Sequence, residues 1–247
     1  ATEDNLLKKT TNGGAGWFGG SYVAGVNPNL FFVNMQTGYS IVENTYSSYS
    51  LLLYKTTNGG TNWYLNKTDS SSRINVIFFP NESTGYMAGS RSGSALYTKL
   101  LKTTNGGATW DSINTNTRFS ANSIFFINGL TGFINIFSGW IYKTTNGAAS
   151  WDSVSNTGSP GKFYFINLNT GFVSGQNTTF KTTNSGETWT TLSIPSGSFY
   201  YNGSDTYTAT GDNGSIYRST NNGSNWVNYR QSVHNGYMNK VQAIDES

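Results

Sequence analysis

The sequence predicts an all-β protein, a β-propeller of about six four-stranded blades, and three observations lead to this prediction. One phrase, written KTTNGGATW at residues 102–110, occurs in six variants along 247 residues. A second phrase, an apolar run followed by an Asn-led turn and a Gly-aromatic pair, precedes most copies. No segment sustains the 3.6-residue apolar period of an amphipathic helix. Part of a seven-bladed or longer propeller is the alternative that this pattern leaves open.

The first phrase ends each time in a tryptophan, and the spacing of these residues is that of propeller blades. They are Trp17, Trp63, Trp110, Trp151, Trp189 and Trp226, separated by 46, 47, 41, 38 and 37 residues. Repeats of this length occur in propellers and in arrays of helix pairs. Short β-rich runs that end in Asn-Gly or a substitute, such as residues 51–55, favour hairpins and therefore the propeller.

Each residue type in the phrase has an expected role in a hairpin. The asparagine side chain is expected to cap the turn through backbone N–H groups, and the glycine to adopt backbone angles that other residues resist. Threonine hydroxyls are expected to bond within the turn, and tryptophan to bury its indole between the hairpin and the neighbouring blade. The six asparagines are Asn12, Asn58, Asn105, Asn146, Asn184 and Asn221.

The second phrase supplies the other strands of each unit. It spans residues 32–39, 79–86, 126–133 and 165–172, and a degenerate copy spans 200–207 with Asp205 and Thr206 in place of Thr-Gly. An apolar strand, a turn, a Gly-aromatic strand, a third strand, a hairpin and a Trp strand make four strands per unit. That count is the one found in a propeller blade.

Composition narrows the class of protein without naming a ligand. Aromatic residues make up 15% and charged residues only 11% of the chain, which predicts a packed domain made soluble by neutral polar groups. A net charge of +3 is too small to indicate nucleic acid, and no transmembrane run is present. The absence of cysteine excludes disulfides and thiolate chemistry, and the abundance of Asn, Ser and Thr favours an extracellular or cell-surface location.

The hairpin phrase resembles the Asp-box (BNR-like repeat) of sialidase-like propellers, with asparagine at the aspartate position. Thr103, Asn105, Gly107 and Trp110 fit that motif, and in the fourth copy Ala148 replaces the glycine. The whole unit is most similar to the repeats of photosystem II assembly (stability) factor-like propellers and related secreted bacterial proteins. This resemblance implies the fold over the whole chain and says little about activity.

The two ends of the sequence suggest an interrupted repeat. Residues 241–247 align with residues 77–83 and stop where Thr-Gly-Tyr would follow, while the chain begins shortly before a hairpin. Two interpretations follow: the ring closes with the C-terminal strand beside the N-terminal hairpin, which leaves one three-stranded blade, or the chain is a piece of a longer one. We expect residues 1–247 to form a single propeller domain that is a module of a longer natural product.

No catalytic set stands out against the repeat. The resemblance implies an arginine cluster in sialidases, but Arg218 occupies a repeat position and Arg73 matches only loosely. Asp111 and Asp152 both follow a motif tryptophan, so the repeat accounts for them, and a glycosidase would need two facing carboxylates. Glu43 and Asp69 are the carboxylates that the repeat does not explain, and solvated loops are the expected setting for both. A lone His234 and the lack of a calcium-type loop predict no metal site and no cofactor.

Two features suit binding. One cation per repeat, at Lys9, Lys55, Lys102, Lys143, Lys181 and Arg218, could hold an acidic partner or polysaccharide, although a solvated charge is the favoured interpretation. The ligand-binding candidates outside the repeat are Tyr46, Tyr49, Arg91 and Trp140.

The expected function is therefore a non-catalytic binding or scaffold propeller for a protein partner or a cell-surface glycan. Such a module could belong to a larger surface assembly. A polysaccharide-acting glycoside hydrolase of the Asp-box group and an assembly factor for a membrane protein complex are the alternatives.

Overall fold

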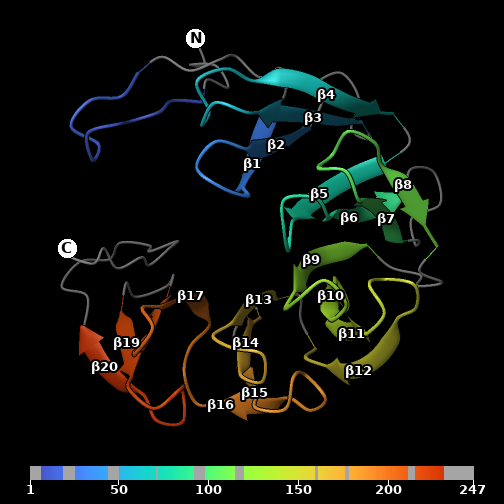
Figure 1. Ribbon diagram of the computed structural model, residues 1–247. Coiled ribbons are helices and arrows are strands. Elements are labelled where there is room, and N and C mark those ends of the chain that lie inside the picture. Colours follow the sequence, from blue (N-terminus) through green and yellow to red (C-terminus); the bar gives the residue numbers. More distant parts are fainter. Residues whose placement is uncertain are drawn as a thin grey trace. The chain divides into compact units, whose positions relative to one another are not determined.

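The computed structural model describes residues 7–18, 26–43, 50–70, 72–91, 98–114, 120–158, 161–175, 178–210 and 215–230. Every helix or strand assigned in these residues is a β-strand (Figure 1). In chain order the strands are β1 (Val26–Phe32), β2 (Gly38–Glu43), β3 (Leu51–Thr56), β4 (Tyr64–Asp69), β5 (Ser72–Phe78), β6 (Gly85–Arg91), β7 (Thr98–Thr103), β8 (Asp111–Ile113), β9 (Ala121–Phe126), β10 (Gly132–Ile136), β11 (Trp140–Thr144), β12 (Asp152–Asn156), β13 (Lys162–Phe165), β14 (Gly171–Ser174), β15 (Thr179–Thr182), β16 (Thr190–Leu192), β17 (Gly197–Tyr201), β18 (Thr206–Thr210), β19 (Ile216–Ser219) and β20 (Val227–Arg230).

The described strands form five four-stranded sheets, each a meander in which chain neighbours pair. The sheets are β1 to β4, β5 to β8, β9 to β12, β13 to β16 and β17 to β20. The pairing is antiparallel, for example Gly38 opposite Thr56 and Gly85 opposite Thr103. The predicted fold class is confirmed: the chain is an all-β propeller, and each sheet is one blade.

Two compact units divide the chain, and each is described by itself. One contains Ala1–Gly132 with Thr144–Trp151, and the other Phe133–Lys143 with Asp152–Ser247. The prediction of a single domain over 1–247 stays a prediction. In the described part of the chain, no helix has the length and apolar character needed to cross a bilayer.

The strands of a sheet differ in how deeply they are buried. The third strands β3 and β7 share one pattern, in which four of six residues are buried, so both faces of these strands are covered. The fourth strands β4, β8, β12 and β16 have no fully buried residue. The fourth strand is thus the exposed edge of its blade, which is why its sequence is polar and variable.

The first strands of the first unit are tied together by asparagines. Asn29 on β1 donates its side-chain amide to the carbonyl oxygen of Asn75 on β5 at 2.9 Å. Asn75 donates in turn to the carbonyl oxygen of Ala121 at the start of β9, also at 2.9 Å. Both asparagines lie where the register of their strand shifts, so the irregularity frees a backbone carbonyl for the neighbouring sheet.

Candidate functional site

The repeated hairpin is held by its own threonine and asparagine. In the hairpin after β7, the Thr103 hydroxyl oxygen accepts a hydrogen bond from the backbone N–H of Gly107 at 2.9 Å. Asn105 Oδ1 accepts one from the backbone N–H of Thr109, also at 2.9 Å. The same two bonds occur in the other five hairpins, with Ser219 replacing threonine in the last. The six motif asparagines therefore cap hairpins and belong to the scaffold.

The hairpin also demands left-handed backbone angles at two successive positions. Gly106 and Gly107 have φ of +62° and +76°. Three copies place other residues there: Ala148 at +75°, Ser185 at +56° and Asn222 at +55°. Asparagine tolerates this region, whereas a buried alanine in it is strained.

Aromatic rings join each hairpin to its own sheet and each sheet to the next. The Trp110 indole lies edge-on to Phe79 at 5.8 Å, and Phe79 stacks on the fully buried Tyr39 of the preceding sheet at 4.4 Å. Equivalent trios follow along the chain: Tyr86, Phe126 and Trp151; Phe133, Phe165 and Trp189; Phe172, Phe199 and Trp226.

These contacts refine the expected position of the tryptophans. Each indole of the five sheets packs against an aromatic ring that lies on, or directly follows, the first strand of its own sheet. Trp189 and Trp226 also touch the preceding sheet, through Phe133 and Phe172. Trp17 differs from all of these, since 61% of its surface is exposed.

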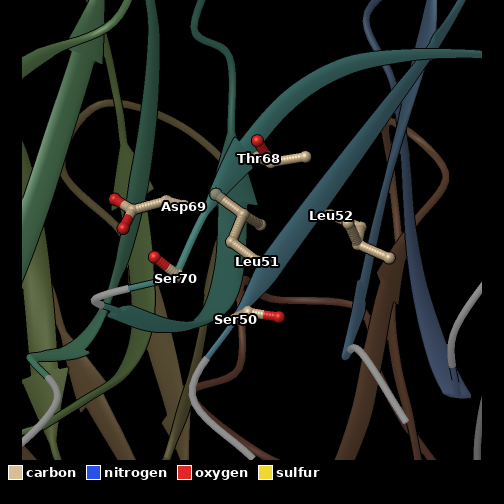
Figure 2. A pocket seen from close by; sticks show the side chains of 6 residues that line it. All are labelled: Ser50, Leu51, Leu52, Thr68, Asp69 and Ser70. Carbon is tan, nitrogen blue, oxygen red and sulfur yellow. The ribbon is translucent and has the colours of Figure 1, made fainter. Parts of the chain in front are cut away.

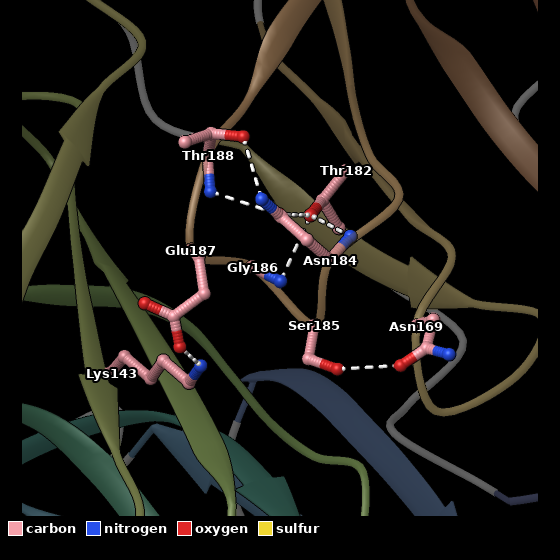
Figure 3. A network of polar contacts seen from close by, with 8 residues as sticks. All are labelled: Lys143, Asn169, Thr182, Asn184, Ser185, Gly186, Glu187 and Thr188. Carbon is pink, nitrogen blue, oxygen red and sulfur yellow. Dashed lines mark hydrogen bonds and ion pairs between the residues drawn. The ribbon is translucent and has the colours of Figure 1, made fainter.

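The motif cations contact protein groups, in contrast to the expectation of solvated charges. Lys55 and Lys102 donate to the carbonyl oxygens of Gly106 and Gly147, in the next hairpin along the chain, at 2.7 and 2.8 Å. Lys143 forms an ion pair with Glu187 (Figure 3). Lys9 and Lys181 reach hydroxyls of the next hairpin, and Arg218 pairs with Asp205. The five lysines thus join neighbouring blades, whereas Arg218 pairs within its own sheet, and both uses argue against an open cationic surface.

Burial at these joints changes the ionisation of the groups that form them. It raises the pKa of Tyr39 to about 12, with a smaller contribution from Tyr64, and it raises the pKa of Tyr86 to about 12. Burial lowers the pKa of Lys55 and of Lys181. Both effects disfavour the charged form, as expected for groups removed from water.

The binding candidates belong to the opposite end of the blades from the hairpins. In a four-stranded meander the first and third connections share one end, and the second lies at the other. Tyr46 and Tyr49 belong to the second connection of the first sheet, outside the described residues. Arg91 is the last residue of β6, before the second connection of its sheet, and Trp140 begins β11 just after that of the third sheet. The connection order thus places Arg91 and Trp140 next to the second connections of their blades, at the opposite end from the hairpins.

The turn before β11 presents two exposed aromatic side chains. Phe137 and Trp140 are 53% and 40% exposed. The turn is tight, because the Gly139 N–H donates to the Ile136 carbonyl oxygen at 2.9 Å and Gly139 has φ of +84°. No residue of the turn is charged.

Buried polar groups hold this turn in one conformation. Asn135, with no exposed surface, donates its amide to the carbonyl oxygens of Gly139 at 3.4 Å and Trp140 at 3.3 Å. Its Oδ1 accepts a hydrogen bond from the Gly161 N–H at 2.5 Å. The hydroxyl and the N–H of Thr157 both donate to the Gly139 carbonyl oxygen at 2.9 Å. A buried amide that makes three hydrogen bonds fixes the backbone that it bonds.

A depression of about 410 Å³ lies at the same topological end of the first sheet (Figure 2). It is open to solvent and is lined by Ser50, Leu51, Leu52, Thr68, Asp69 and Ser70. In Figure 2 the carboxylate of Asp69 and the hydroxyl of Ser70 lie near each other on one side of the depression. Its lining combines three hydroxyl residues, two leucines and one carboxylate. Ser50 directly follows the segment with Tyr46 and Tyr49 in the sequence.

The structure corrects the expected setting of the two unexplained carboxylates. Glu43 and Asp69 are not in loops: they are the last residues of β2 and β4. Leu51 of β3 is the register partner of both residues. Glu43 and Asp69 therefore lie on either side of Leu51 in the same row of the sheet, two strands apart. Asp111 and Asp152 begin the edge strands β8 and β12 and are exposed, as the repeat predicts.

The described residues contain no cluster of three or more His, Cys, Asp or Glu side chains suited to a metal. His234 lies outside the described residues.

Sequence reasoning missed the residues that build the aromatic turn. Phe137 was not singled out, although Phe-Ser-Gly-Trp combines a turn signal with two aromatics that the repeat does not explain. Asn135 was also missed, because it lies two residues beyond the second phrase, inside the apolar strand β10. Sequence reasoning also missed a repeated asparagine on the first strands. Asn29, Asn75 and Asn122 are spaced by 46 and 47 residues, as the first three motif tryptophans are.

Comparison with known proteins shows the fold. No family model and no curated protein sequence matches the chain. Among solved structures, an ancestral GH74 enzyme matches 87% of this chain with a TM-score of 0.65 at 19% identity. YCF48 from Cyanidioschyzon merolae matches 83% of this chain and 74% of its own, with a TM-score of 0.60 at 15% identity. The computationally designed Ika8 protein matches 91% of this chain and 66% of its own, with a TM-score of 0.63 at 10% identity.

The chain spans 32% of the length of the ancestral GH74 enzyme. At these identities the likeness shows a shared β-propeller architecture. That architecture is common to an enzyme, YCF48 and a designed protein, so the fold does not select among functions.

Proposed function

We propose that this chain is a non-catalytic binding propeller. It recognises a protein partner or a cell-surface glycan through aromatic side chains at the second connections of its blades, and it works outside the cell or at the cell surface. The observation that carries this proposal is the turn with the exposed rings of Phe137 and Trp140, whose backbone is bonded at Gly139 and Trp140 by the buried side chains of Asn135 and Thr157.

The argument for binding is one of preorganisation. An exposed aromatic side chain costs little to order on binding when its backbone is already fixed. A fully buried asparagine, in contrast, is costly to keep unless each polar atom is bonded, and Asn135 is bonded through both its amide and its oxygen. A network of this kind supports a turn of fixed shape that presents rings to solvent.

The remaining polar chemistry of the chain supports a scaffold. The repeated asparagines and threonines are used in the hairpins, and the motif lysines are used between blades. These groups repeat because the blade repeats. Recognition is then expected at positions that differ between blades, such as the second connections.

A binding experiment with two ligand sources tests the proposal. The protein is applied to an immobilised oligosaccharide panel, neutral and anionic, and to a phage-displayed peptide library. We expect one source to yield a ligand whose binding falls at least tenfold in Trp140→Ala or in Tyr46→Ala/Tyr49→Ala. Leu168→Ala, which removes an exposed apolar side chain from a first connection, is the matched control and is expected to bind normally.

Two results would contradict the proposal. One is the absence of a ligand from both sources. The other is cleavage of a bound oligosaccharide, detected as shorter products by mass spectrometry after incubation, which would instead favour a glycoside hydrolase.

A further inference from the structure

The surroundings of Phe137 and Trp140 are polar and uncharged. Trp140 is paired across the sheet with Asn156, an exposed residue at the end of β12. Ser138 lies between the two aromatic residues, and Thr157 and Gly158 follow Asn156. None of residues 136–140 and 156–158 carries a charge. The rings are therefore flanked by hydroxyl and amide groups, and a ligand that fits them is itself uncharged and rich in hydrogen-bonding groups.

The exposed area of the two rings indicates the size of ligand that they can contact. A Phe or Trp side chain has about 150–250 Å² to bury, so the exposed fractions of 53% and 40% leave roughly 200 Å² in total. A specific protein interface takes about 800 Å² from each partner. The two side chains alone offer about a quarter of that area, which is enough for a ligand of one or two sugar rings, whereas a protein partner would need further surface around the turn.

We infer that this turn is a subsite for an uncharged oligosaccharide, which stacks a sugar ring on Trp140. The inference rests on the proposed binding function and names the ligand class at one of its sites. A pyranose ring has an apolar C–H face that lies on an aromatic ring and hydroxyls around its rim. Asn156 Oδ1 accepts a hydrogen bond from the Gly158 N–H at 2.7 Å, so the Asn156 NH₂ group and the Ser138 hydroxyl are the groups that we assign to that rim. Apolar walls with few polar groups are typical of ligand sites.

The charge pattern favours neutral over anionic sugars. Carboxylate or sulfate groups are recognised by arginine or lysine through charge-assisted hydrogen bonds. The described residues of the turn and of the facing strand end supply no such cation, and the motif lysines are bound at the hairpins. A neutral sugar needs no cation, and the aromatic faces supply the apolar contact.

The test is native affinity electrophoresis of the whole chain in gels that contain hydroxyethylcellulose, galactomannan or polygalacturonate. We expect at least one of the two neutral polysaccharides to retard the protein. Trp140→Ala and Phe137→Ala should each weaken that retardation at least tenfold, whereas Leu168→Ala should leave it unchanged. Circular dichroism of each variant confirms that the fold is retained, and Phe137→Ala keeps the test valid if Trp140→Ala does not fold.

The outcomes distinguish this inference from the proposed function. Retardation by polygalacturonate alone, or neutral-sugar binding that persists in both aromatic variants, would overturn the assignment of this subsite. A peptide ligand that depends on Trp140, found without any neutral-sugar binding, overturns the sugar assignment and leaves the binding function standing. No ligand of any class would overturn both.

Discussion

The hydroxyl of Tyr39 donates a hydrogen bond to the carbonyl oxygen of Gly106 at 2.7 Å, across the joint between the first two sheets. The Lys55 ammonium group donates to the same oxygen, also at 2.7 Å. At the next joint, Tyr86 and Lys102 share the carbonyl oxygen of Gly147, at 3.3 and 2.8 Å. At each of these two joints one carbonyl oxygen thus receives two side-chain donors from the preceding sheet.

Where the tyrosine is replaced by phenylalanine, the lysine takes another partner. Phe133 and Phe172 have no hydroxyl, and the lysines of their sheets reach side chains instead: Lys143 pairs with Glu187, and Lys181 donates to Ser224. The lysine therefore bonds a backbone carbonyl oxygen where the joint has a tyrosine, and a side chain where it has a phenylalanine.

Tyr39→Phe is expected to lower the free energy of unfolding by about 1 kcal/mol, the usual net value of one hydrogen bond. Lys55 keeps the Gly106 carbonyl oxygen bonded, so the loss stays small. Tyr86→Phe should cost less, because its hydrogen bond is longer at 3.3 Å. Urea denaturation of both variants measures the difference, and a larger cost for Tyr86→Phe would refute this ranking.

Alkaline pH is expected to destabilise the protein through these tyrosines. Burial raises the pKa of Tyr39 and Tyr86 in the folded protein to about 12, from an ordinary value near 10. The unfolded chain therefore loses these protons first, and the free energy of unfolding falls as pH rises from about 10 towards 12.

The double variant Tyr39→Phe/Tyr86→Phe isolates this effect from that of the lysines. Burial lowers the pKa of Lys55 and Lys181, so deprotonation of these groups acts in the opposite direction. Unfolding free energies of the wild type and the double variant, measured between pH 8 and 11.5, should converge as pH rises. A constant difference over that range would show that the two tyrosines do not cause the loss.

Gly186→Ala is expected to be strongly destabilising. Gly186 has φ of +75°, and a Cβ there would overlap the ring of Phe133, which is fully buried and unable to move aside. Left-handed strain and overpacking together predict a loss of about 2–4 kcal/mol.

Ala148→Gly is the matched reverse change at the same hairpin position. Ala148 has φ of +75° and is fully buried. Relief of its backbone strain should stabilise the protein by up to about 1 kcal/mol. Thermal unfolding of both variants measures the two changes in stability. The two effects are not expected to be equal and opposite, because a Cβ at position 186 would overlap the Phe133 ring. Destabilisation by Ala148→Gly would contradict the strain argument.

Arg218 and Asp205 are expected to be energetically coupled. Arg218 donates through Nε at 2.9 Å and Nη2 at 2.5 Å to one carboxylate oxygen of Asp205, whose side chain is only 10% exposed. Both residues depart from the repeat, which has lysine and threonine at these positions. Arg218→Lys alone should cost about 1–2 kcal/mol, because it leaves the largely buried carboxylate with fewer hydrogen bonds.

The double variant Arg218→Lys/Asp205→Thr restores the repeat at both positions. It is expected to recover part of that loss, which gives a coupling free energy of about 1 kcal/mol in a double-mutant cycle. Additive effects of the two single changes would mean that the ion pair contributes nothing to stability.

The sequence by itself determined the blade. Six copies of a Thr-x-Asn-x-Gly-x-x-Trp phrase, spaced by 37 to 47 residues, specify a hairpin through contacts within eight residues. Contacts of that range, such as Thr103 to Gly107 and Asn105 to Thr109, follow from local chemistry alone. For the same reason the repeat accounts for Asp111 and Asp152, which both follow a motif tryptophan.

Only the tertiary structure decided what the repeated lysines do and which aromatic residues form a surface. Lys102 meets Gly147 across 45 residues, and Asn135 meets Gly161 across 26, so no local pattern identifies either pair. Exposure, too, depends on packing partners elsewhere in the chain: Phe133 is fully buried and Phe137 is 53% exposed, although both are phenylalanines of one strand and its turn. The surface proposed for recognition emerges from that difference, because only packing decides which rings remain in contact with water.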